Sequence, residues 1–160
     1  MAALKFVRSV WESFRCNSGL EPLLLDNLRI SAAQPGKVKF ELEIQKQHSN
    51  RLGTLHGGTI ASLVDLGGSL ALASNGLYAT GVSTDLNVTY LKAGKIGDLL
   101  RAEVICDKLG KNLAFTTSSF FSSKGELIAR GSHTKYVALA WKDPNNQIEQ
   151  MEPEGKAKSE

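Results

Sequence analysis

Residues 57–75, Gly-Gly-Thr-Ile-Ala-Ser-Leu-Val-Asp-Leu-Gly-Gly-Ser-Leu-Ala-Leu-Ala-Ser-Asn, are the most informative part of this sequence about architecture. They show no strand-like alternation, are rich in Ala and Leu, and precede Gly76, which together predict a helix. Because apolar residues run nearly all the way round it, the helix is expected to be buried. The central Asp65, the Gly and Ser residues and the flanking strand patterns disfavour a membrane span.

A two-residue periodicity flanks this helix on both sides. Residues 28–32 and 38–44 alternate between apolar and polar and are joined by the turn Gln34-Pro35-Gly36-Lys37, which predicts an antiparallel hairpin. Four further strand patterns follow the helix, at residues 82–90, 99–106, 112–121 and 126–139. One apolar helix among six such strands predicts an α+β fold, with an antiparallel sheet wrapped around a central buried helix.

Residues 3–16 predict an extra helix at the N-terminus. Its apolar positions are Leu4, Val7, Trp11 and Phe14, and its basic positions are Lys5, Arg8 and Arg15. We favour an amphipathic helix that packs on the domain; a short mitochondrial presequence is the alternative, which Glu12 disfavours. The expected division is therefore a helix and linker (1–24), a folded domain (25–140) and a polar tail (141–160) that is disordered because apolar residues nearly vanish after Trp141.

The composition excludes several classes of function. A net charge of +3 on 160 residues is too weak to indicate binding to nucleic acid or to an anionic membrane. Two distant cysteines, Cys16 and Cys106, form no disulfide framework, which indicates a reducing, intracellular compartment such as the cytoplasm or the mitochondrion. Three histidines without ligand spacing give no metal signature.

Asp65 is the one charged residue between Gly57 and Thr84, and its neighbours are apolar. A carboxylate on a buried helix is costly unless it is paired or hydrogen-bonded, and one buried without a cation can act as a general base near neutral pH. The alternative is an aspartate that is hydrogen-bonded across a subunit interface and has no catalytic duty. Both interpretations stay open on the residues alone.

The turn formed by residues 53–58 leads directly into the helix. Backbone N–H groups at a helix N-terminus have no intrahelical acceptor, and glycine lets a ligand approach them closely. The N–H of Gly57 could therefore hold a developing thioester oxyanion, helped by the side chain of Asn50 or His56. A capping role for His56 and an ordinary turn role for Asn50 are the alternatives.

The spacing of these candidates constrains the assembly. Asp65 lies eight residues after Gly57, which places them about 12 Å apart along one helix. A reacting carbonyl needs its polarising donor and its base within about 3 Å or one water molecule. Two antiparallel helices at a dimer interface could supply both groups, so a catalytic role for these residues predicts at least a dimer.

Two further positions carry weaker signals. Ser83 begins the polar face of the strand after the helix and could orient a water molecule, although a lone serine there is more often structural. Lys108-Leu109-Gly110-Lys111-Asn112 places two lysines around a glycine turn. Such lysines could bind phosphate as point charges, and a solvated hairpin turn is the alternative.

The residues around the start of this helix resemble a known family motif. His48-Ser49-Asn50-Arg51-Leu52-Gly53-Thr54-Leu55-His56-Gly57-Gly58, followed by Asp65, resembles the pattern of hotdog-fold thioesterases, in particular the thioesterase superfamily member 2 type. The stretches 81–90, 110–116 and His133-Thr134-Lys135 resemble it too, so the likeness covers roughly residues 25–138. Arg51 and Ser49 depart from it, since family members often have a small residue and a threonine there.

The resemblance implies a hotdog-fold acyl-CoA thioesterase that works without a cofactor as a tetramer, a dimer of dimers. It implies that Gly57 and Asn50 polarise the thioester carbonyl with support from His56. Asp65 and Ser83 of the partner subunit would activate water. The implied CoA-binding residues are Tyr90, Lys108, Leu109, Gly110, Lys111, Asn112 and Leu113.

Two other functions remain open. A non-catalytic acyl-CoA- or lipid-binding hotdog protein would share the fold, because one fold hosts many functions. The joint presence of Asn50, Gly57, Asp65 and Ser83 favours catalysis over it. A dehydratase acting on hydroxyacyl thioesters is a weaker alternative, because His56 and Asp65 do not obviously face one β-carbon.

Overall fold

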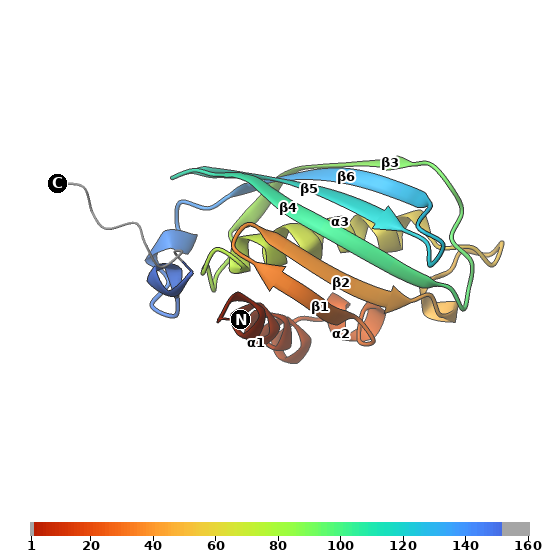
Figure 1. Cartoon of the computed structure of the whole chain (residues 1–160), viewed down its shortest axis with the longest axis horizontal. Helices are drawn as coiled ribbons and strands as arrows, with labels where there is room; N and C mark the ends of the chain where they lie inside the picture. Colours follow the sequence, from red (N-terminus) through yellow and green to blue (C-terminus); the bar gives the residue numbers. More distant parts are fainter. Residues whose placement is uncertain (1, 152–160) are drawn as a thin grey trace.

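The computed structural model describes residues 2–151 (Figure 1). The helices are α1 (Ala2–Asn17), α2 (Leu20–Leu24) and α3 (Gly57–Ala73), with short 3-10 turns at Lys46–His48, Ala140–Lys142 and Ile148–Gln150. The strands are β1 (Arg29–Gln34), β2 (Lys37–Glu43), β3 (Val82–Tyr90), β4 (Leu99–Leu109), β5 (Leu113–Phe121) and β6 (Leu127–Tyr136).

All six strands form one antiparallel sheet in the order β1-β2-β4-β5-β6-β3, which curves around α3 (Figure 1). Alternate residues point inward, as Val38, Phe40 and Leu42 of β2 do, and are almost fully buried. They pack with the buried residues of α3 into one core. The predicted α+β fold, a sheet wrapped around a central helix, is confirmed.

Two glycines explain how a helix fits so closely inside the sheet. A Cβ added to Gly67 would lie 2.9 Å from Val104 Cγ2 of β4, and one on Gly131 of β6 would lie 2.6 Å from Val64 Cγ2 of α3. Such approaches are shorter than real Cβ contacts, so glycine is needed where helix and sheet meet. The helix forms despite its glycines because burial of its apolar side chains outweighs their low helix propensity.

The N-terminal helix packs on the domain, as its amphipathic pattern predicted. Its buried residues are Ala3, Phe6, Val7, Val10 and Trp11, and the ring of Phe6 lies 6.4 Å from that of Tyr78 between centroids. The short helix α2 lies inside the expected linker and contains Pro22, a residue type that usually ends a helix. Pro22 is the third residue of α2, and N–H groups in a first helical turn need no intrahelical acceptor.

The predicted disorder of the C-terminal segment is wrong for residues 141–151. The indole N–H of Trp141 donates to Gly110 O at 3.1 Å, and Asn146 accepts from the backbone of Tyr78 at 2.8 Å. Met151 is buried. A few well-spaced apolar and amide side chains therefore hold this polar segment to the domain; residues 152–160 lie outside the described part.

No helix within residues 2–151 combines the length and the hydropathy needed to cross a membrane.

Candidate active site

Asp65 stands at a junction of three elements. The hydroxyl of Ser83, on β3, donates a hydrogen bond to Asp65 Oδ1 at 2.8 Å. His133 Nε2, on β6, lies 2.8 Å from the Ser83 oxygen and 3.4 Å from Asp65 Oδ1. Since Ser83 gives its proton to the carboxylate, its oxygen accepts from His133. The result is a hydrogen-bond chain that runs from His133 through Ser83 to Asp65.

The surroundings of Asp65 differ from the sequence-based expectation. Its side chain is 48% exposed in the single chain, not buried, and it has polar partners. The reason is helical periodicity, because Gly58, Ala61, Ser62 and Asp65 form one stripe of α3 that the sheet leaves uncovered. The prediction of a helix buried on every side is therefore wrong along this stripe. The carboxylate is therefore open to solvent in the single chain.

His133 is the member of this cluster that sequence reasoning did not assign to the site. Its ring is fully buried, and Nδ1 has no hydrogen-bond partner among the described residues. The ring lies so close to α3 that a Cβ on Gly68 would be within 2.4 Å of Nδ1. Burial, followed by the charge of Lys135, lowers the pKa of His133. The sequence signal that could have indicated His133 is strand alternation, because His133 and Lys135 occupy inward-facing positions of β6.

Gly57 and His56 form the other candidate end of the site, at the start of α3. His56 is the N-cap residue, and its Nδ1 accepts from the Gly58 N–H at 2.7 Å. The Gly57 N–H has no acceptor within residues 2–151 and lies at the positive end of the helix dipole. The Tyr90 hydroxyl donates to Gly57 O at 2.9 Å and thereby fixes this turn. A backbone donor here is available to a ligand oxygen.

Asn50 is held within its own turn. Its Oδ1 accepts from the N–H groups of Leu52 and Thr54, at 2.9 and 3.2 Å. Its Nδ2 donates to Thr54 Oγ1 at 2.9 Å, which leaves one amide proton for another acceptor. The turn role that the sequence left open is therefore present, and the carbonyl-polarising role stays a prediction.

The predicted CoA-binding residues lie at opposite ends of the sheet. The stretch from Lys108 to Leu113 is the tip of the β4–β5 hairpin, and Leu113 is paired with Tyr136 at the end of β6. Tyr136 also pairs with Val82, at the start of β3, whereas Tyr90 is at the end of β3. The strand registers therefore place this hairpin near the Ser83 end and Tyr90 near the Gly57 end. One chain does not bring these two groups together.

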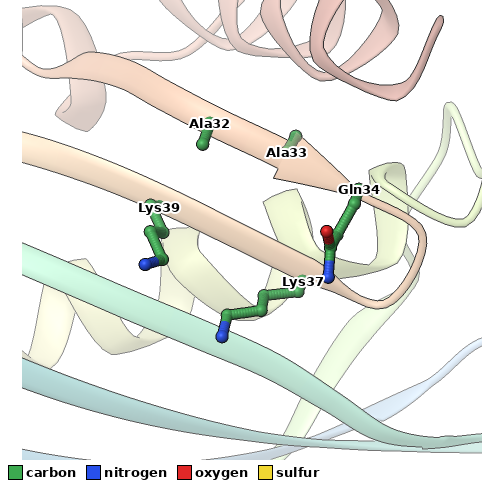
Figure 2. A pocket seen from close by; sticks show the side chains of 5 residues that line it. All are labelled: Ala32, Ala33, Gln34, Lys37 and Lys39. Atoms are coloured by element: carbon green, nitrogen blue, oxygen red, sulfur yellow. The ribbon is translucent and has the colours of Figure 1, made fainter. Parts of the chain in front are cut away.

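A shallow depression lies elsewhere on the sheet, beside β1 and β2. It has a volume of about 300 Å³ and is lined by residues of β1 and β2, among them Lys37 and Lys39, whose side chains reach from β2 toward β4 (Figure 2). Both ammonium groups already bind the carboxylate of Glu103, at 2.7 and 3.2 Å. This one carboxylate offsets one of the two positive charges, and salt screens the other at the surface. None of the predicted site residues lines this depression.

Known proteins resemble this chain over most of its length. A profile of the thioesterase superfamily matches residues 52–129. A Schizosaccharomyces pombe protein, whose name assigns it provisionally to the esterases, is 47% identical over 150 residues, which is 93% of each chain. Acyl-coenzyme A thioesterase 13 of Homo sapiens is 41% identical over 117 residues, which cover 71% of this chain and 82% of that protein.

Solved structures agree with the sequence relatives. Zebra fish thioesterase superfamily member 2 superposes with a TM-score of 0.77 at 38% identity, covering 83% of this chain and 96% of that one. A Streptococcus pneumoniae hypothetical thioesterase, crystallised with coenzyme A, superposes with a TM-score of 0.67 at 26% identity, covering 70% and 89% of the two chains. Sequence and fold lead to one conclusion: the chain belongs to the thioesterase superfamily and is a thioester hydrolase with the hotdog fold.

Proposed function

We propose that this protein hydrolyses acyl-CoA thioesters, fatty acyl-CoA among them, to the carboxylic acid and CoA, with Asp65 as the base that activates water. The observation that carries the proposal is the Asp65 carboxylate, exposed on the open stripe of α3 and oriented by the Ser83 hydroxyl at 2.8 Å. The choice of CoA thioesters is supported by the printed names of the human relative and of the coenzyme A complex from Streptococcus pneumoniae.

The proposed reaction uses both ends of the site. Asp65 takes a proton from water as the water oxygen bonds to the thioester carbon. The carbonyl oxygen becomes an oxyanion, which accepts hydrogen bonds from the Gly57 N–H and from the remaining amide proton of Asn50. Collapse of this intermediate breaks the C–S bond and releases CoA as a thiolate, which takes up the proton that Asp65 accepted and so regenerates the base. His56 supports the Gly57 end by capping the helix.

Each site is proposed to form between two subunits. Gly57 and Asp65 lie on one uninterrupted helix, about 12 Å apart along its axis. Tyr90 and the 108–113 hairpin tip are also separated within one chain. Antiparallel pairing of two copies through their α3 stripes would bring the Gly57 and Tyr90 end of one subunit to the Asp65 and hairpin end of the other.

The exposed edge of the sheet supports this dimer. Strand β3 pairs with β6 alone among the described strands, and its Val82, Leu86 and Tyr90 are 63, 36 and 54% exposed. An edge strand with exposed apolar side chains favours pairing with another chain. A dimer of dimers is proposed as well, because the outer face of the sheet carries the partly exposed Ile105, Leu113, Phe115 and Tyr136.

The decisive experiment is thiol release from saturated acyl-CoAs of increasing chain length, with wild type beside Asp65→Asn. We expect wild-type turnover and a loss of roughly 10²-fold or more in kcat for the variant, because a general base is removed. Asp26→Asn is the matched control, since Asp26 pairs with Arg15 at the surface near α1. Sedimentation would check that all three proteins have the same assembly.

The outcomes separate the competing functions. Tight acyl-CoA binding without thiol release at any chain length would favour the non-catalytic binding protein. Alkene formation from a hydroxyacyl-CoA, without thiol release, would favour the dehydratase. Equal kcat values for wild type and Asp65→Asn would leave a thioesterase but remove Asp65 from its mechanism.

A further inference from the structure

A buried lysine lies beside the proposed site and has no part in the reaction described above. Lys135, on β6, is 3% exposed. Its Nζ donates to Ser69 Oγ at 2.5 Å and lies 3.5 Å from Thr80 Oγ1, and no carboxylate is within 4.0 Å of it among the described residues. Burying an ammonium group against hydroxyls alone is costly. Burial lowers the pKa of Lys135 to about 8, so it is charged at neutral pH.

The register between β6 and α3 places this charge beside the Asp65 cluster. His133 and Lys135 share the inner face of β6, about 6.6 Å apart along the strand. Asp65 and Ser69 share one face of α3, about 6 Å apart along the axis. His133 contacts Asp65, and Lys135 contacts Ser69. These two contacts between β6 and α3 are therefore neighbours along the helix. The ammonium is therefore about one helical turn from the carboxylate.

Few other charged side chains lie near these two contacts between β6 and α3. Asp65 is the sole charged residue of α3, and β5 carries no titratable side chain. Strand β3, which pairs with β6, contributes Asp85, whose charge raises the pKa of His133 as that of Asp65 does. Burial and the charge of Lys135 lower the pKa of His133, and their effect outweighs that of the two aspartates. Lys135 is the sole cation among these influences.

His133 Nε2 can donate to Ser83 whether the ring is neutral or doubly protonated, so a second proton changes the charge of the ring and not this bond. His133 Nε2 donates to Ser83, and Ser83 donates to Asp65. A second proton would go to Nδ1, which is buried without a partner beside the Gly68 backbone. The doubly protonated ring would then stand as a cation 3.4 Å from Asp65 Oδ1, and such an ion pair weakens the carboxylate as a base for water.

We propose that Lys135 is a positioning residue for the hydrolytic reaction, whose buried positive charge keeps His133 neutral and thereby leaves Asp65 available to water. The proposal rests on the proposed function for its link to catalysis. Its electrostatic part, the action of Lys135 on His133, stands independently of the substrate.

The test is the pH profile of kcat, from pH 5 to pH 9, for wild type and Lys135→Met. Without the ammonium, His133 binds its second proton more readily, so the acid limb of the profile is expected to move upward by about one pH unit. The variant would be up to about tenfold slower near pH 6. It would match wild type near pH 9, where His133 is neutral in both proteins and Lys135 has lost its proton in wild type.

Three variants keep the test decisive. Lys135→Arg retains the charge and is expected to restore the wild-type acid limb. Lys135→Gln retains a hydrogen-bond donor and replaces Lys135→Met if that variant does not fold. Lys5→Met removes an exposed lysine of α1 and is the matched control, expected to leave the profile unchanged.

A direct titration separates this proposal from the proposed function. NMR of the imidazole Cε1–H groups in the full assembly reports the midpoint of His133, one of three histidines, without substrate. We expect that midpoint to rise by about one pH unit in the Lys135→Met or Lys135→Gln variant. An unmoved midpoint, or an equal loss of kcat at every pH, would overturn the proposal. Absent thiol release in wild type would instead overturn the proposed function, while the titration still decides the effect of Lys135.

Discussion

The two ends of the proposed site are held in different ways. At the start of α3, His56 caps a residue two positions away and Asn50 binds a residue four positions away. Around Asp65, the hydrogen bonds join residues 18 and 50 positions apart in the chain. The donor end is therefore set mainly by local turn and cap geometry, with one long-range bond from Tyr90 to Gly57. The base end, in contrast, exists only when α3, β3 and β6 have packed together.

The largest effect expected from this contrast is at the base end. Ser83→Ala breaks the chain between His133 and Asp65 while it changes little else, so kcat should fall by about 10- to 100-fold. Ser83→Thr keeps the hydroxyl and should recover most of the loss. The check is kcat for both variants, with thermal unfolding beside it. A Ser83→Ala enzyme with wild-type kcat would show that the chain has no part in activity.

The same contrast explains how much of the site could be predicted from sequence. Asp65 could be found because an isolated charge stands out in an apolar helix, and Gly57 because it begins that helix. His133 could not be assigned from residues alone, because its place beside Ser83 depends on the register of β3 on β6. Partners that are 50 positions apart carry no local pattern that joins them.

The fold was more predictable than the site because periodicity reports which face of an element is buried. The alternation of residues 38–44 and the apolar run of residues 57–75 gave their strand and helix directly. The predictions are wrong where a few specific contacts determine whether a segment is ordered, as in the segment that Trp141 and Asn146 hold to the domain. The exposed stripe of α3 was missed because composition cannot show which side a sheet leaves open.

A smaller effect is expected at Asn50, where the turn and the carbonyl-polarising roles can be separated. Asn50→Asp keeps the oxygen that accepts from Leu52 and Thr54 but lacks the amide donor. We expect about tenfold lower kcat with nearly unchanged stability, less than the roughly 10²- to 10³-fold loss of a principal oxyanion donor, because the Gly57 N–H remains. Asn50→Ala should lower both kcat and stability. Equal kcat in Asn50→Asp and wild type would limit Asn50 to its turn.

The smallest effect is expected at His56, whose observed role is to cap α3. His56→Ala removes the acceptor of the Gly58 N–H, which should lower the free energy of unfolding by about 1 kcal/mol. His56→Asn supplies another side-chain cap and should restore that stability, as urea unfolding would measure. If capping is its whole contribution, kcat should follow stability and recover in His56→Asn as well. If stability recovers while kcat stays low, the imidazole itself acts on the substrate, and the donor end depends on more than local geometry.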